Sequence, residues 1–141
     1  MKCPCCPEQN LVPAFIDNLL RSHHCPHCQG HWLLIEDYVS WLERNKSDLS
    51  QDEADYQLED SKIALFCPAS GVLMQKYRIN NDSDHKLDYS PQVGGVWLDR
   101  GEWEYLKSQG IACSLNKIFT THWQRQLREN DAKATFEDLY R

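Results

Sequence analysis

The residues best suited to chemistry are the cysteines, which gather at the start of the chain. Five of the seven cysteines fall within the first 28 residues. Four of them form two pairs with two residues between the members of each pair, and eighteen residues separate the pairs: Cys3, Cys6, Cys25 and Cys28. A tight turn brings two such thiolates to one point, and two turns complete a tetrahedron. The spacing therefore predicts one zinc ion per chain, bound by these four cysteines.

This predicted site is structural, but its exact ligand set has alternatives. Four thiolates fill the coordination sphere of zinc and leave no position for a substrate. Cys5 stands next to Cys6, and four further candidate donors lie close by in the sequence: His23, His24, His27 and His31. A single iron is an alternative metal, since it binds the same thiolates. A less favoured second site would combine Cys67, His85 and Cys113.

The sequence pattern of the first part of the chain recurs about 64 residues later. Residues 3–6 (Cys-Pro-Cys-Cys) match residues 67–70 (Cys-Pro-Ala-Ser), and residues 30–33 (Gly-His-Trp-Leu) match residues 95–98 (Gly-Val-Trp-Leu). At the four ligand positions the second copy has one cysteine and three other residues: Cys67, Ser70, Ser90 and Val93. One thiolate cannot hold zinc, so we expect a metal-free second copy that keeps its structure through its own apolar contacts.

These motifs resemble the transcription factor IIB-like zinc-finger family of small bacterial proteins. The resemblance rests on the two Cys-Pro-x-Cys motifs, on Gly-x-Trp-Leu, and on Val-Trp-Leu-Asp-Arg-Gly-Glu at residues 96–102. It covers residues 3–42 and 67–107, and implies a zinc ribbon in two copies, the second without its metal ligands. The first copy departs from the family pattern at residues 34–36, where Leu-Ile-Glu replaces Asp-x-Gly. The implied ligands are the four paired cysteines, Cys3, Cys6, Cys25 and Cys28.

The elements around the cysteines predict a small α+β fold. Apolar runs flank turn residues at 17–18 and 80–84, so each copy is expected to form a β-hairpin. Helical spacing of apolar residues follows each Trp-Leu pair, and each helix should pack on its own hairpin. The expected units are a zinc ribbon, an acidic linker, a metal-free repeat and a helical tail, at residues 1–45, 46–62, 63–110 and 111–141.

The tail is expected to join the two ribbon-like units. Apolar residues recur at helical spacing along it, and a last short helix is expected near its end: Leu115, Ile118, Phe119, Trp123, Leu127, then Phe136, Leu139 and Tyr140. Units of this size bury little surface alone. Docking of the tail on both units would cover its apolar stripe.

Composition and motifs favour a non-enzymatic interaction module with a protein partner. The 141-residue chain has a formal charge of −6, which disfavours binding bulk nucleic acid over its whole surface. It has no nucleophile elbow, P-loop or dinucleotide-binding turn. Five tryptophans exceed the needs of so small a core, and aromatic residues are enriched at protein interfaces.

Nucleic-acid binding in transcription or RNA handling is the alternative function. Basic residues accompany Trp123 along the tail: Lys117, His122, Arg125 and Arg128. Thiol catalysis by Cys5 or Cys113 is a third and weaker alternative, because neither thiol has an evident base. No window approaches the roughly 20 apolar residues of a membrane span, and no apolar leader follows Met1, so we expect a cytoplasmic protein without membrane contact.

Overall fold

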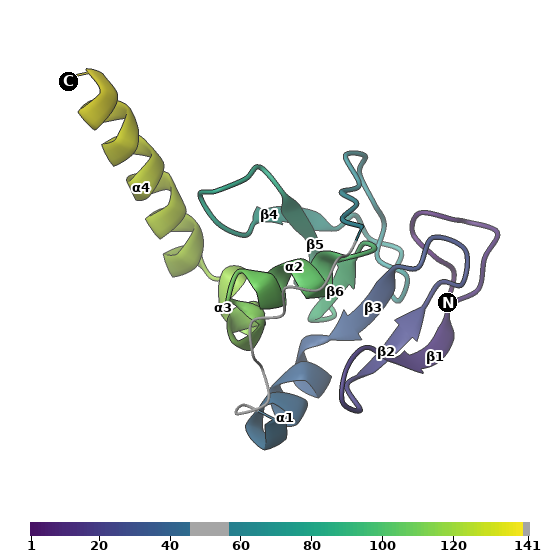
Figure 1. The fold of residues 1–141 in the computed structure, drawn as a ribbon. Coiled ribbons are helices and arrows are strands. Elements are labelled where there is room, and N and C mark those ends of the chain that lie inside the picture. Colours follow the sequence, from purple (N-terminus) through teal and green to yellow (C-terminus); the bar gives the residue numbers. More distant parts are fainter. Residues whose placement is uncertain (46–56, 140–141) are drawn as a thin grey trace.

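The computed structural model describes residues 1–45 and 57–139. Within them, one antiparallel sheet has the strand order β1-β2-β3-β6-β5-β4 (Figure 1). Its strands are β1 (Val12–Phe15), β2 (Arg21–His24), β3 (His31–Leu34), β4 (Gln75–Arg78), β5 (Lys86–Ser90) and β6 (Gly95–Leu98). The helices are α1 (Ile35–Asn45), α2 (Glu102–Ser108), the 3-10 helix η2 (Ala112–Ser114), α3 (Leu115–Ile118) and α4 (Thr121–Leu139).

Both predicted hairpins are present, and each continues into a third strand that we did not predict. β1 pairs with β2, and β4 pairs with β5, across the expected turns. The two Trp-Leu pairs lie in β3 and β6, just before their helices, and these strands pair with each other so that Trp32 faces Trp97. The two units therefore share one sheet.

Close packing between tryptophan and glycine holds this central strand pair together. A Cβ atom at Gly95 would lie 2.3 Å from the Trp32 ring, and one at Gly30 would lie 2.3 Å from the Trp97 ring. A side chain at either position would force the ring out of its place. Each unit thus supplies the glycine that admits the other unit's tryptophan.

Each helix contacts its own hairpin, as expected: Trp41 of α1 donates to the carbonyl of Asn18, and Tyr105 of α2 accepts from Asn80. The helices also pack on each other in one shared core, which was not expected. Trp103 of α2 makes edge-on ring contacts with two residues of α1, at centroid distances of 6.4 Å from Tyr38 and 5.9 Å from Trp41. Leu33 of β3 and Val96 of β6 belong to the same buried cluster. Folding of either helix therefore depends on apolar surface from both units.

The tail bridges the two units, as expected. Leu115 and Ile118 of α3 are completely buried in the shared core. The Tyr38 hydroxyl donates to the carbonyl of Ala112 (2.6 Å) and accepts from the amide of Leu115 (3.2 Å). In the second unit, the carbonyl of Ile79 accepts a hydrogen bond from the indole of Trp123 (2.9 Å). The tail is thus tied to both.

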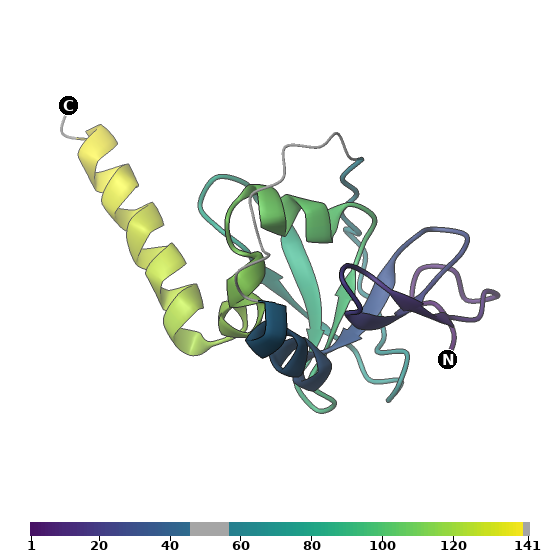
Figure 2. The same ribbon diagram turned by 60° about the horizontal axis from the view of Figure 1, so that its bottom comes forward.

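Helix α4 is longer than expected and leaves the body of the protein. Instead of a separate last helix, one helix runs to Leu139, and Tyr140 lies outside the described residues. Its last buried residue is Leu127, and the following turns project away from the sheet (Figures 1 and 2). Within the described chain, no helix has both the length and the apolar character required to cross a bilayer.

The described part of the expected linker lies against the second unit. Residues 46–56 lie outside the described residues. Further along, the amide and hydroxyl of Ser61 donate to the Asp99 carboxylate at 2.9 and 2.8 Å, and the amide of Glu59 donates to the carbonyl of Arg100 at 2.9 Å. This segment is therefore fixed by hydrogen bonds to the residues that follow β6.

Replacing Tyr38 with phenylalanine tests the link between α1 and the tail. We expect Tyr38→Phe to lower the free energy of unfolding by about 1–3 kcal/mol, because the buried carbonyl of Ala112 loses its donor. Tyr77→Phe is the matched control, since the Tyr77 hydroxyl donates to the exposed side chain of Gln75. Urea unfolding gives the free energy of unfolding of both variants. An equal decrease in the two variants would contradict the link between α1 and the tail.

Candidate metal centre

The structure brings the four predicted cysteines together. The sulfur atoms of Cys3, Cys6, Cys25 and Cys28 all lie within 4.8 Å of one another. The sulfurs of Cys3 and Cys28 are 3.6 Å apart. A zinc ion with Zn–S bonds of about 2.3 Å has sulfurs about 3.8 Å apart at the corners of a tetrahedron. The four thiols therefore have the size and composition of a closed zinc site.

Tight turns position each cysteine pair. In the second pair, the amide of Cys28 points to the Cys25 sulfur (3.5 Å), and the amide of Gln29 donates to the Cys25 carbonyl (2.9 Å). Gln29 has a positive φ of 64°, which turns the chain sharply back toward β3. In the first pair, the amide of Gln9 donates to the Cys6 carbonyl (2.8 Å). Amides directed at sulfur stabilise thiolate charge.

Burial controls the protonation of these thiols. It raises the pKa of Cys3 to about 12 and also raises the pKa of Cys28. At Cys25 burial acts in the same direction, but hydrogen bonds from the amides of Cys28 and His27 outweigh it and lower the pKa. Zinc must therefore displace protons from buried thiols, and its affinity falls as the pH falls.

Cys5, the alternative ligand, points away from the other four sulfurs. Its sulfur lies 3.4 Å from the Ser61 hydroxyl and donates to Asp99 at 3.7 Å. Burial raises the pKa of this thiol, and the nearby Asp99 charge adds to the effect. Cys5 thus connects the first cysteine pair to the second unit and does not replace Cys6.

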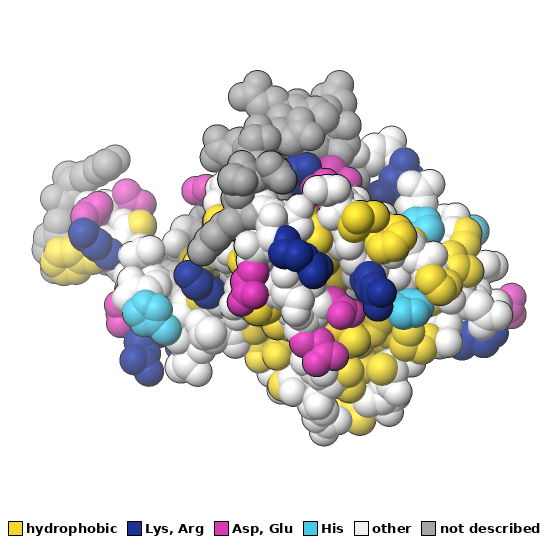
Figure 3. Space-filling model, turned by 90° about the horizontal axis from the view of Figure 1, so that it is seen from below, with side chains coloured by type: hydrophobic (Ala, Val, Ile, Leu, Met, Phe, Trp, Pro, Cys, Tyr) yellow, Lys and Arg dark blue, Asp and Glu magenta, His cyan; other side chains and the backbone are white. Residues whose placement is uncertain are grey.

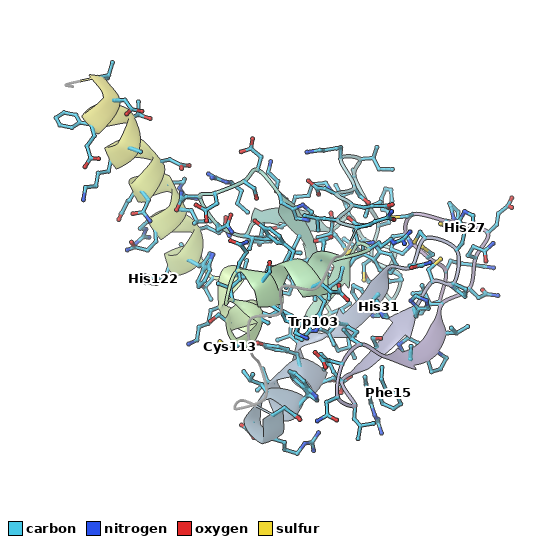
Figure 4. The ribbon with its side chains drawn as sticks, viewed as in Figure 1. Phe15, His27, His31, Trp103, Cys113 and His122 are labelled. Carbon is cyan, nitrogen blue, oxygen red and sulfur yellow. The ribbon has the colours of Figure 1, made fainter. Side chains whose placement is uncertain are left out.

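None of the four nearby histidines joins this sulfur cluster among the described residues. The Nδ1 atom of His31 lies 2.9 Å from the Ser22 hydroxyl, and its ring centroid is 4.6 Å from that of His24. Burial, with a smaller effect of His24, lowers the pKa of His31 to about 4. Figure 4 shows His27 in the loop near the sulfur atoms and His31 on the sheet.

A turn of the same geometry as the turn at residues 25–28 begins at Cys67 in the second unit. The amide of Ser70 points to the Cys67 sulfur (3.4 Å), and the amide of Gly71 donates to the Cys67 carbonyl (2.8 Å). Burial raises the pKa of Cys67, but hydrogen bonds from Ser70 and Ser90 outweigh it and leave the pKa lowered. Ser70 and Ser90, at two of the positions aligned with zinc ligands in the sequence, therefore lie beside this sulfur.

The less favoured site of Cys67, His85 and Cys113 is wrong. The only cluster of metal-binding side chains within residues 1–45 and 57–139 is the first one. Cys67 is buried near the sheet, whereas Cys113 is exposed in η2. His85 instead lies with its Nε2 atom 3.1 Å from the Glu102 carboxylate.

A buried acidic pair after β6 is a feature that sequence reasoning missed. Asp99 accepts from the Trp97 indole (2.9 Å), and its own amide donates to Glu102 (2.7 Å). Burial, followed by the Asp99 charge, holds the pKa of the completely buried Glu102 well above its usual range. Both acids belong to the Trp-Leu-Asp-x-Gly-Glu motif at residues 97–102, and this motif is the sequence feature that could have indicated the pair. Through its hydrogen bonds, Asp99 joins Trp97 of the second unit to Cys5 of the first.

Comparison with known proteins agrees with this site. A family model described as transcription factor zinc-finger matches residues 2–44, the segment that contains all four cysteines. No curated protein and no solved structure matches the chain. The family match and the four close sulfurs together identify one zinc ion per chain in an N-terminal zinc ribbon.

Substitution of one cysteine at a time tests the ligand set. We expect Cys28→Ser to reduce the zinc content from one per chain to near zero, whereas Cys5→Ser keeps it, because Cys5 faces Asp99. Elemental analysis of both purified variants gives the result. Loss of zinc in Cys5→Ser with retention in Cys28→Ser would contradict the assignment.

Zinc removal should unfold both units together, not the first unit alone. The ligands Cys3 and Cys25 share a buried cluster with Trp97 and Met74 of the second unit. The expected independence of residues 63–110 therefore conflicts with the shared core. Trp97 lies in β6, the strand that joins the second unit to β3 of the first. When a chelator removes the zinc, the amide NMR signals of β5 and β6 should therefore lose dispersion together with those of β2. Persistent dispersion in β5 and β6 would contradict this coupling.

Proposed function

We propose that this chain is a non-enzymatic, cytoplasmic module whose zinc ribbon binds a protein partner through the uncovered side of β1, β2 and β3. Alternating residues of these strands share that side and form what we call the hairpin face: Pro13, Phe15, Arg21, His23, Trp32 and Leu34. They line a cavity of about 380 Å³. The observation that carries the proposal is this apolar, hollowed face on a rigid ribbon.

The corresponding side of the second unit is covered by its own chain. Leu65 packs in a buried cluster with Trp97, and Lys76 donates to the carbonyl of Ser61 at 2.7 Å and pairs with Asp88. The segment of residues 57–66 thus supplies a cover in the second unit. The first unit has no equivalent cover among the described residues, which leaves room for another chain.

The exposed side chains of the hairpin face suit a protein interface. Phe15 is 58% exposed at the end of β1, and Figure 4 shows it at the outer edge of the hairpin. Apolar side chains gather on the side of the molecule that carries this hairpin, with basic and histidine side chains among them (Figure 3). Aromatic residues and arginine are the types that dominate binding energy at protein interfaces.

Zinc acts in this proposal as a structural element. Four thiolates leave no coordination position for a substrate, so the metal fixes the ribbon and does not perform chemistry. The ion anchors the loops at the start of β1 and between β2 and β3. The hairpin face is therefore held in a fixed shape before a partner arrives, which lowers the entropic cost of binding.

Nucleic-acid binding through the tail is less well supported by the geometry. The stacking role would require Trp123, but its indole donates to the Ile79 carbonyl and its ring packs on the core. Acidic residues follow the basic residues directly, at Glu129 and Asp131, and Asp131 pairs with Arg78. These contacts favour a protein partner over single-stranded nucleic acid.

Phe15→Glu tests the hairpin face. We expect it to lower the capture of a specific partner from a native cell extract at least about tenfold, because a charge replaces an exposed anchor. Phe66→Glu is the matched control, since Phe66 is 59% exposed elsewhere and should leave capture unchanged. Quantitative mass spectrometry identifies and measures the captured protein. Equal capture by both variants would refute the proposed face.

We also infer that the two units are copies of one zinc ribbon. The repeated order of three strands and a helix, the reciprocal Trp-Gly contacts and the Cys67 turn support this. We expect the triple variant Ser70→Cys, Ser90→Cys, Val93→Cys to bind a second zinc, because Cys67 supplies the fourth thiolate. Elemental analysis should then give two zinc ions per chain; one would contradict the inference.

A further inference from the structure

Residues 57–66, which we call the cover segment, are held by the turn at residues 99–102, which we call the anchor turn. Ser61 of the cover segment donates two hydrogen bonds to a carboxylate of this turn, at 2.9 and 2.8 Å. A Cβ atom at Gly101 would lie 2.1 Å from the carbonyl oxygen of Gln57, so the two segments are in close contact. The position of the cover segment therefore depends on the shape of the anchor turn.

Glu102 fixes the shape of the anchor turn from inside the protein. One of its carboxylate oxygens accepts from the amide of Asp99 (2.7 Å), and its own amide donates to the Asp99 carbonyl (3.0 Å). Glu102 is completely buried, and its Oε2 atom lies 3.1 Å from the Nε2 atom of His85. Within the described chain, neither of these two atoms has any other hydrogen-bond partner. One proton between them would satisfy both atoms, because a carboxyl group donates and a neutral imidazole accepts.

The surroundings favour Glu102 as the site of this proton. The Asp99 carboxylate accepts from the Trp97 indole and from the cover segment, and a second buried negative charge beside it is unfavourable. Burial, followed by the Asp99 charge, accordingly raises the pKa of Glu102. Burial lowers the pKa of His85, which keeps its ring neutral. With Nε2 as the acceptor, the ring proton is on Nδ1, which faces the Asp60 carboxylate at 3.8 Å.

Several neighbouring elements contribute other titratable groups around this pair. The described groups are Asp60 and Lys62 of the cover segment, Lys76 of β4, Asp88 of β5, Asp99 of the anchor turn, Tyr105 of α2, and Cys5 of the first unit. Lys76 pairs with Asp88, and burial raises the pKa of Asp88 to about 6. Burial also raises the pKa of the Cys5 thiol above its ordinary value of 9.0. Both groups therefore titrate mainly outside the range from about pH 7 to about pH 9.

We propose that a proton held between Glu102 and His85 keeps the cover segment closed, and that the segment opens as the pH rises. When Glu102 loses this proton, its charge repels that of Asp99, and the anchor turn no longer fits the segment. Opening exposes the side of the second unit that contains Trp97, which is the counterpart of the hairpin face. This inference concerns the second unit and does not depend on the partner of the hairpin face.

The direction of the pH dependence follows from the number of protons on the pair. The closed pair holds one proton. In the open form both side chains meet water and titrate near their ordinary pKa values, 4.5 for Glu102 and 6.5 for His85. The open pair therefore holds two protons in acid, one between these values and none above about pH 6.5. Above about pH 6.5, opening releases one proton, so the opening equilibrium constant rises about tenfold per pH unit until Glu102 ionises in the closed form.

Hydrogen exchange measured by NMR on the zinc-loaded protein tests this opening. The amides of Glu59 and Ser61 are protected by hydrogen bonds to the anchor turn, and the ratio of their observed to intrinsic exchange rates reports opening. In the wild type this ratio should rise about tenfold per pH unit between about pH 7 and 9. In Glu102→Gln the ratio should stay constant, because the side-chain amide donates to His85 at every pH. Glu104→Gln is the matched control, since it removes an exposed acid from the same helix and should behave as the wild type.

Two results of this experiment would overturn the proposal: a wild-type ratio that does not change with pH, or the same pH dependence in Glu102→Gln as in the wild type. The NMR signals of the two ring nitrogens of His85 provide a second test, which uses the wild type and requires no variant to fold. At about pH 7, Nδ1 should carry the ring proton and Nε2 should be unprotonated. A protonated Nε2 would show that Glu102 is not the donor and would also overturn the proposal.

Discussion

The pairing of β3 with β6 is the constraint on which the rest of this structure depends. Two ribbon-like units, each too small to bury a substantial core, meet edge to edge at these strands. The contact requires glycine at positions 30 and 95, because each admits the tryptophan ring of the other unit. One face of the joined sheet then presents Leu33, Val96 and Leu98 to the helices, and the other presents the paired tryptophans to the metal site.

The β3–β6 junction explains how one zinc ion can stabilise both units. The zinc ligands Cys3 and Cys25 are buried in the same cluster as Trp97, so the metal stabilises packing on both sides of this junction. Cys5 adds a polar link to Asp99 beyond β6. The second unit, whose described residues form no metal-binding cluster, pairs its strands with a unit that the metal holds.

Local patterns in the sequence predicted the cysteine cluster and both hairpins, but not how the units combine. The Cys-x2-Cys spacing encodes its own tight turns, and residues 17–18 and 80–84 have turn chemistry of short range. The β3–β6 pair joins residues about 65 apart, and the edges that meet carry no charge or turn signal that marks them. Local patterns likewise do not show that Trp32 and Trp97 pack on glycines of the opposite unit, or that Asp99 and Glu102 are buried together.

The two halves of the sheet are covered differently, and the proposed function rests on this asymmetry. In the second unit, residues 57–66 cover the side of the sheet that holds Trp97, where Lys76 pairs with Asp88 and donates to the Ser61 carbonyl. The equivalent side of the first unit keeps Phe15 and Arg21 exposed beside a cavity. Covering this face would bury apolar surface at little entropic cost, because zinc and the shared sheet already hold its strands in place. This combination of a rigid, apolar and uncovered surface is the basis for the proposed binding of another chain.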